Sequence, residues 1–182
     1  MTLIVRETRE TRIRVELAAG DGDTASSIET GVSFLDHMLQ TFARYAGLTL
    51  RVEATGDLRH HLIEDVAICI GAALADVTPA HAARYGDRTI PMDDALVHCA
   101  LDLGGRPYYR GPLPSTLYDH WMRSFSDNAR ATLHLRVLRG VDRHHVVEAA
   151  FKALGLAVRD ALADHGAVFS TKGAVRFGEQ RC

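Results

Sequence analysis

Cysteine is scarce in this chain of 182 residues, and its few cysteines follow no pattern. Cys69, Cys99 and Cys182 show no paired or C-x-x-C spacing, and the first two lie in apolar runs typical of a protein core. We therefore expect no disulfide framework, a reducing compartment and, accordingly, a cytoplasmic protein.

Long hydrophobic runs and an excess of one charge are also absent. Residues 66–74 form one of the longest apolar stretches, which is too short to cross a bilayer, and residues 1–10 contain no apolar signal region. The 21 Lys and Arg nearly balance the 23 Asp and Glu, so no basic stripe is available for nucleic-acid phosphates. We expect neither a membrane nor a nucleic acid as partner.

Histidine, in contrast, is abundant, and its ten copies reveal an internal repeat. Each half carries an Asp-His pair followed by a His-His-x-x-Glu sequence: Asp36-His37 with residues 60–64, and Asp119-His120 with residues 144–148. The Asp-His pairs are 83 residues apart and the His-His pairs one residue more, which a single loop insertion explains. We expect one domain over residues 1–182, made of repeats at roughly 1–80 and 90–165 with a tail at 166–182.

The apolar patterns predict the same order of elements in both halves: two strands, a helix, a strand and a second helix. Expected strands are 11–17, one after a turn at 20–23, 48–54, 95–103, one near 108, and 131–138; expected helices are 33–45, 60–77, 115–129 and 144–163. Paired sheets with helices packed between or against them make an α+β fold.

The two motifs point to metal binding. On a helix, Glu64 lies one turn after His60 and on the same face, whereas His61 projects about 100° away, so one motif can serve two neighbouring sites. The candidate ligands are His37, His60, His61, Glu64, His120, His144, His145 and Glu148. Shared between two ions, they leave positions open for a substrate. Imidazole and carboxylate without thiolate favour Mn²⁺, with Fe²⁺ or Zn²⁺ as substitutes.

Simpler interpretations stand beside this one. A single His-His-x-x-Glu sequence on a helix is more often a solvated face than a ligand set, and only its repetition favours metal binding. Asp36 and Asp119 either orient a neighbouring imidazole or simply begin a helix.

Several motifs together resemble the imidazoleglycerol-phosphate dehydratase family of histidine biosynthesis. They lie at 34–39, 60–65, 92–96, 102–108, 144–153 and 170–173, and the resemblance extends from about residue 6 to residue 173. It implies two β-sheets sandwiching a helical layer of duplicated halves, a site with two Mn²⁺ ions, and a homo-oligomer of 24 subunits with active sites at subunit interfaces.

The resemblance also implies roles for individual residues. It makes the same eight side chains the metal ligands, adds Glu10 to Glu64 and Glu148 as candidate catalytic carboxylates, and assigns the substrate phosphate to Arg84, Arg106, Lys152, Ser170 and Lys172. Cations and a hydroxyl suit a phosphate dianion. Without the resemblance, Arg84 and Arg106 would be interpreted as surface ion pairs, and Glu10 as a solvated strand residue.

The sequence departs from the family pattern at three places. The loop before His60 is about three residues shorter than in the family, and the connection from Arg106 to His120 is about ten residues shorter. Thr41 and Tyr45 stand where the family often has Gln and His. These changes concern substrate contacts more than metal binding, since all eight ligand positions are retained.

Three functions remain in view. The first is a hydro-lyase that dehydrates imidazole glycerol phosphate to imidazole acetol phosphate, with the substrate bound as imidazolate between two metals. The second is a dinuclear metal-dependent hydrolase of another phosphorylated small molecule. The third is a metal-storing shell protein, which the His-His-x-x-Glu order and the Ser-Thr-Lys-Gly tail disfavour.

Overall fold

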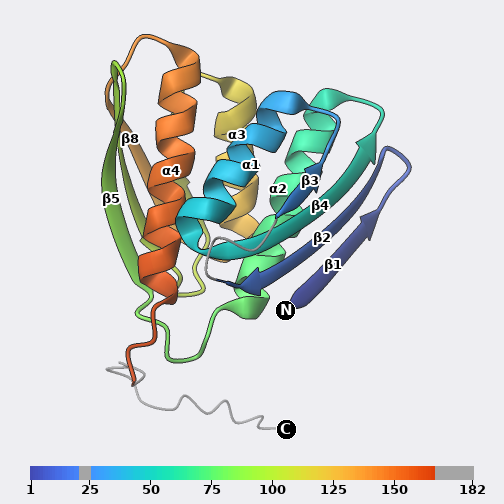
Figure 1. Cartoon of the computed structure of the whole chain (residues 1–182), viewed down its shortest axis with the longest axis horizontal. Helices are drawn as coiled ribbons and strands as arrows, with labels where there is room; N and C mark the ends of the chain where they lie inside the picture. The colour runs from blue at the N-terminus through green and yellow to red at the C-terminus, as the bar shows by residue number, and fades with distance from the viewer. Residues whose placement is uncertain (21–25, 167–182) are drawn as a thin grey trace, which may run out of the picture.

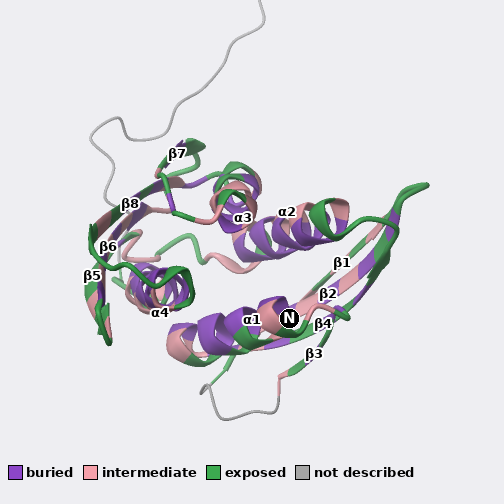
Figure 2. Cartoon of the chain, turned by 90° about the horizontal axis from the view of Figure 1, so that it is seen from above, coloured by how far each residue is buried: buried purple, intermediate pink, exposed green. Residues whose placement is uncertain are grey.

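The computed structural model describes residues 1–20 and 26–166, which form two four-stranded sheets with four helices between them (Figures 1 and 2). The elements are β1 (Thr2–Glu7), β2 (Thr11–Ala19), β3 (Ser27–Glu29), α1 (Ser33–Ala46), β4 (Leu48–Gly56), α2 (Arg59–Val77), β5 (Tyr85–Met92), β6 (Ala95–Asp102), β7 (Tyr108–Arg110), α3 (Thr116–Asn128), β8 (Thr132–Arg139) and α4 (Arg143–Leu162). The α+β class and the helical layer between two sheets are confirmed.

Each half begins with one more strand than the sequence patterns predicted. The additional strands, β1 and β5, are edge strands of their sheets. Leu3 and Val5 are exposed on β1, and β5 includes Pro91, which an edge strand tolerates because one side of its backbone needs no partner. Exposed apolar side chains and a proline hide the alternation by which strands are recognised.

The two sheets repeat each other in order and register. Their strand orders are β1-β2-β4-β3 and β5-β6-β8-β7, and in each the last strand pairs parallel to its neighbour. The pairing of Arg6 with Ile13 recurs 84 residues later as Ile90 with Val97. The first hairpin can therefore be superposed on the second by residue number.

The helices pair across the two halves, α1 with α4 and α2 with α3, and glycine permits their close approach. A Cβ atom on Gly71 of α2 would lie 2.5 Å from the carbonyl oxygen of Phe125 on α3, and one on Gly155 of α4 would lie 2.8 Å from that of Phe42 on α1. The rings of Phe42 and Phe125 meet edge to face at 5.9 Å. Each helix pair therefore takes one member from each repeat.

The helix ends agree largely with expectation. Helix α1, expected over 33–45, spans Ser33–Ala46; Gly47 follows it in the left-handed conformation with a φ of 66°, and Val32 occupies the N-cap without a side-chain hydrogen bond. Cys69 and Cys99 are buried and free, as expected. None of the helices in residues 1–20 and 26–166 is long and apolar enough to cross a membrane.

Candidate metal centre

The first group of ligands, here called the α1/α4 cluster, consists of His37, His144 and Glu148. Their donor atoms all lie within 4.8 Å of one another. Glu148 Oε2 is 3.1 Å from His144 Nε2 and 3.5 Å from His37 Nε2. The spacing of His144 and Glu148 by one helical turn places both side chains on one face of α4, and the packing of α1 on α4 adds His37.

The second group, the α2/α3 cluster, consists of His60, Glu64 and His120, again within 4.8 Å. Glu64 Oε2 lies 3.7 Å from His60 Nε2, and Glu64 Oε1 lies 3.4 Å from His120 Nε2. Each cluster thus combines a His-x-x-x-Glu pair from one repeat with a histidine from the other. Two imidazole nitrogens and one carboxylate oxygen form a donor set suited to Mn²⁺, Fe²⁺ or Zn²⁺, with positions left open.

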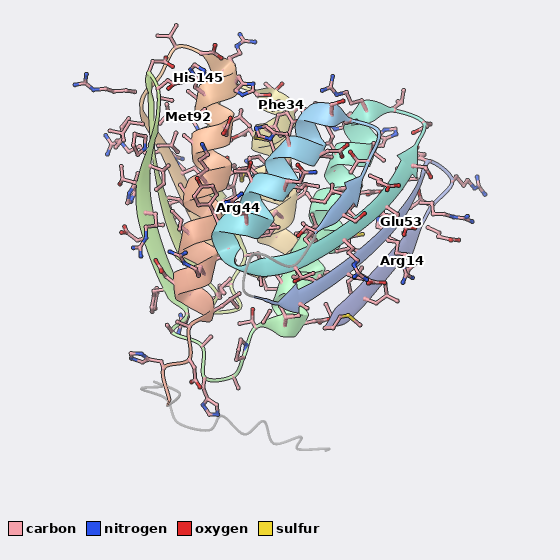
Figure 3. All side chains as sticks on the ribbon, in the orientation of Figure 1. Arg14, Phe34, Arg44, Glu53, Met92 and His145 are labelled. Carbon is pink, nitrogen blue, oxygen red and sulfur yellow. The ribbon has the colours of Figure 1, made fainter. Side chains whose placement is uncertain are left out.

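The two clusters lie at the same end of the helical layer. The ring of Phe34, at the start of α1, packs 5.1 Å from Tyr118 at the start of α3 and 5.1 Å from His144 at the start of α4. Figure 3 shows Phe34 and His145 at this end of the molecule. The helix starts therefore assemble both ligand groups around a shared aromatic contact.

The remaining two predicted ligands, His61 and His145, belong to neither cluster. His61 Nδ1 lies 3.1 Å from Asp57 Oδ1 and 3.4 Å from Glu10 Oε2. His145 Nδ1 lies 2.7 Å from Asp94 Oδ1. The hydrogen bond that its ring donates to Asp57 raises the pKa of His61, and the hydrogen bond to Asp94 raises the pKa of His145. The chain therefore brings six of the eight predicted ligands together and directs two elsewhere.

Lys152 braces the α1/α4 cluster. Its Nζ lies 2.8 Å from Glu148 Oε1 and 3.2 Å from the sulfur of Met92. Burial alone would raise the pKa of Glu148, but the hydrogen bond and charge of Lys152 outweigh it, so this pKa lies below its usual value. This lowered pKa favours the ionised form of Glu148, the form that a metal ligand would need.

A cavity of about 460 Å³ opens beside the α2/α3 cluster, large enough for a small metabolite. Its lining includes His60, His120, Leu113, Leu117 and Arg123. The connection between Arg106 and His120 supplies the Leu113 wall. Arg123 was not singled out from the sequence, although it lies one turn after His120 on the same helix face.

Arg84 and Arg106 lie far from both clusters. The Arg84 backbone N–H donates to the carbonyl of Ala161 at the C-terminal end of α4, whereas His144 is at its start, about 25 Å away at 1.5 Å per residue. Arg84 Nε donates to Asp102 Oδ1 at 2.6 Å, and the charge of Arg106 also acts on Asp102. Within one chain, neither arginine reaches a substrate held at the histidines. Ser170 and Lys172 lie outside the described residues.

Asp36 and Asp119 lie in the first turns of α1 and α3, where they bind the preceding chain segment rather than an imidazole. Asp36 Oδ1 accepts hydrogen bonds from the backbone N–H and hydroxyl of Thr30, and Asp119 Oδ1 accepts them from the Tyr109 hydroxyl at 2.5 Å and the Leu113 N–H at 2.9 Å. Asp57 and Asp94, which contact the Nδ1 atoms of His61 and His145, were not predicted as partners of these imidazoles. The spacing of Asp57 four residues before His61 was a usable signal, whereas Asp94 is 51 residues from His145.

Comparison with known proteins gives a consistent result. The family model of imidazoleglycerol-phosphate dehydratase matches residues 30–158. Imidazoleglycerol-phosphate dehydratases of Salinibacter ruber and Pyrobaculum calidifontis are each 46% identical to the chain over 94% of it, and the matches cover 94% and 98% of those proteins. A crystal structure of IGPD from Pyrococcus furiosus in complex with (S)-C348 has a TM-score of 0.84 and 40% identity, covering 94% of this chain and 100% of that one.

Proposed function

The chain belongs to the imidazoleglycerol-phosphate dehydratase family, a family of lyases, and we propose that it converts imidazole glycerol phosphate to imidazole acetol phosphate in histidine biosynthesis. The observation that carries the proposal is the pair of matched ligand clusters, each assembled from both repeats. We expect the enzyme to work in the cytoplasm, in keeping with its free buried cysteines.

We propose that two Mn²⁺ ions per active site are the cofactor, with Fe²⁺ or Zn²⁺ as substitutes. His37, His144 and Glu148 would hold one ion, and His60, Glu64 and His120 the other. His61 and His145 are the remaining expected ligands, and their Nδ1 atoms contact Asp57 and Asp94 rather than the residues of these clusters. Their direction favours ligation between neighbouring copies of the chain.

The reaction must remove a hydrogen from an unactivated carbon and a hydroxyl group from its neighbour. When bound, the two ions would hold the substrate imidazole as imidazolate, whose electrons help to expel the hydroxyl. Glu10 is the best-placed proton acceptor, because its carboxylate is 57% exposed and its contact in the described residues is the 3.4 Å approach to His61. Glu64 and Glu148, each held between two histidines, are better suited to ligation than to proton transfer.

The positions of the expected phosphate-binding arginines favour an active site shared between subunits. Within one chain, Arg84 lies about 25 Å from His144 along α4, and this distance exceeds the length of the substrate. Arg84, Arg106, Ser170 and Lys172 would therefore bind the phosphate of a substrate held by another copy, and Lys152 would approach it from beside Glu148. The expected homo-oligomer, of 24 subunits by resemblance to the family, meets this requirement.

The decisive experiment is turnover by the purified, Mn²⁺-loaded protein. Imidazole glycerol phosphate is supplied, and imidazole acetol phosphate is followed by absorbance while metal content is measured in the same samples. Removing the metal with a chelator should abolish turnover, and adding Mn²⁺ should restore it. Full metal loading without turnover would overturn the proposal. Hydrolysis of other phosphate esters, without inhibition by triazole, would instead support the hydrolase interpretation.

A further inference from the structure

The turns of the two repeated hairpins place equivalent carboxylates beside equivalent histidines. Because the hairpins superpose with an offset of 84 residues, Glu10 between β1 and β2 occupies the position of Asp94 between β5 and β6. His61 and His145 are related by the same offset. Glu10 Oε2 is 3.4 Å from His61 Nδ1, and Asp94 Oδ1 is 2.7 Å from His145 Nδ1. The two halves therefore use the same position differently.

In the second half, Asp94 is fully engaged. Its Oδ1 faces His145 Nδ1, while its Oδ2 accepts hydrogen bonds from the backbone N–H groups of Val141 at 2.6 Å and Asp142 at 3.2 Å. It thus fastens the turn between β5 and β6 to the start of α4. Asp93, the other nearby carboxylate, is 70% exposed and lies 3.4 Å from His145 Nε2, which is too long for a strong hydrogen bond.

In the first half, Asp57 rather than Glu10 binds both the histidine and the backbone at the start of the helix. Asp57 Oδ1 is 3.1 Å from His61 Nδ1, and the same oxygen accepts a hydrogen bond from the Leu58 N–H at 2.6 Å. Asp57 belongs to the loop between β4 and α2, at a position equivalent to Val141 in the second half. Glu10 lies farther from the imidazole and extends into solvent.

We propose that Asp57 and Asp94 are positioning residues that hold His61 and His145 with the proton on Nδ1 and with Nε2 free to ligate a metal, and that Asp57 thereby leaves Glu10 available for proton transfer. A carboxylate that accepts a hydrogen bond from one imidazole nitrogen fixes the tautomer and the ring orientation. The role of Nε2 as a ligand rests on the proposed function, whereas the tautomer does not.

The first test measures tautomers in the metal-free protein, by ¹⁵N NMR of the histidine rings above their pKa values. In the wild type, His61 and His145 should carry their proton on Nδ1. Asp57→Ala should shift His61 toward the Nε2–H form without affecting His145, and Asp94→Ala should do the reverse. Asp93→Asn is the matched control and should change neither. Unchanged tautomers in the two alanine variants would overturn the proposal.

The second test uses asparagine, which retains one oxygen acceptor but replaces the other oxygen with a donor. Asp57→Asn keeps the single oxygen that serves both partners, so Mn²⁺ affinity should stay within a few-fold of wild type. Asp94→Asn turns an NH₂ group toward two backbone donors, so affinity should fall about 10–100-fold, the usual cost of losing a carboxylate behind a ligating histidine. Equal losses in the two variants would contradict the proposed hydrogen-bond geometry.

The two proposals fail in different ways. A wild-type protein that binds no Mn²⁺ or does not turn over would refute the proposed function, while the tautomers would still support the positioning role. Normal turnover with tautomers insensitive to Asp57 and Asp94 would refute the positioning role alone.

Discussion

The two ligand clusters are copies of one motif in different surroundings. Glu148, in the α1/α4 cluster, is only 8% exposed and is braced by Lys152, whereas Glu64, in the α2/α3 cluster, is 34% exposed and borders a cavity of about 460 Å³. The first-half position equivalent to Lys152 is occupied by Ile68. The repeat thus supplies identical donors twice, but the carboxylate is buried in the α1/α4 cluster, here called the closed cluster, and part-exposed beside a cavity in the α2/α3 cluster, here called the open cluster.

The open cluster is the better entrance for a small substrate. The cavity walls of Leu113 and Leu117 offer apolar surface to a ring, and Arg123 adds a cation at the same opening. The closed cluster offers Lys152 as its cation, already paired with Glu148. The repeated motif therefore accounts for the donor atoms, and the different side chains around them account for the difference in carboxylate burial.

Replacing the carboxylate ligands should have the largest effect and tests whether the clusters are equivalent as metal sites. Glu64→Gln and Glu148→Gln each remove the only charged donor of a cluster. Each variant should lose about half of the bound metal and lower kcat by at least about 100-fold, since a weakened ligand set costs more than the 10–100-fold of an outer hydrogen bond. Elemental analysis and turnover measure this.

His81→Gln is a suitable control for these variants, because His81 is exposed and lies beyond the end of α2. It should retain metal and activity. Near-full metal content in both glutamine variants would contradict the ligand assignment.

The glycines test whether helix packing across the repeats builds both clusters alike. Gly71→Ala places a methyl group 2.5 Å from the carbonyl oxygen of Phe125, against 2.8 Å from that of Phe42 for Gly155→Ala. Each should lower the free energy of unfolding by about 1–3 kcal/mol, the usual cost of overpacking, with Gly71→Ala the more severe. Urea unfolding measures the difference. If either alanine variant were more stable than the wild type, close packing of the helices at that glycine would not be required.

The sequence indicated which side chains come together better than it indicated how they are grouped. The repeat identified all six clustered side chains, because a duplicated His-His-x-x-Glu motif is visible in the residue letters alone. It could not indicate that α1 pairs with α4 and α2 with α3, because these pairings depend on close contacts between residues distant in sequence, at Gly155 for the first pair and at Gly71 for the second. Asp94 was missed as a partner of His145 for the same reason.

The overall class and most helices followed from periodicity, whereas the edge strands did not. Strands β1 and β5 lack a fully buried face, so local patterns gave no clear signal for them. Arg84 shows the limit for single residues. Its pairing with Asp102 is the surface ion pair expected without the resemblance, and only an assembly of several chains could bring it to the substrate.

Stability provides a third test of the comparison, because only the closed cluster contains a lysine. Glu148→Gln leaves Lys152, which is 17% exposed, without an ionised partner. The metal-free variant should be less stable than wild type by about 1–3 kcal/mol, while Glu64→Gln should change little. Thermal unfolding with chelator present measures both. In the double variant Glu148→Gln with Lys152→Met, much of the loss should be recovered; equal effects of the two single variants would contradict the distinction.

The smallest expected effect concerns the far end of α4, where Arg84 donates to both oxygens of Asp102 at 2.6 and 3.0 Å. The hydrogen bond from Arg84 holds the pKa of Asp102 below its usual value. A lowered carboxyl pKa stabilises the fold above the unfolded-state pKa of about 3.9, and this stabilisation disappears as the pH falls through the folded-state pKa. Because Arg84 is about one-third exposed, solvent screening reduces the gain, and Asp102→Asn should cost only about 0.5–1 kcal/mol at pH 7.

The measurement is urea unfolding of wild type and Asp102→Asn at pH 7 and again below the folded-state pKa of Asp102, where the difference should vanish. Metal content should remain that of the wild type, because this pair lies about 25 Å from the histidines. Asp87→Asn is the control, since Asp87 is exposed and faces only His98 at 3.4 Å among the described ion pairs. A loss of metal in Asp102→Asn would mean that the ion pair at the end of α4 affects the metal site at its start. The difference between the closed and open clusters would then depend on the whole of α4 and not only on the side chains beside Glu148.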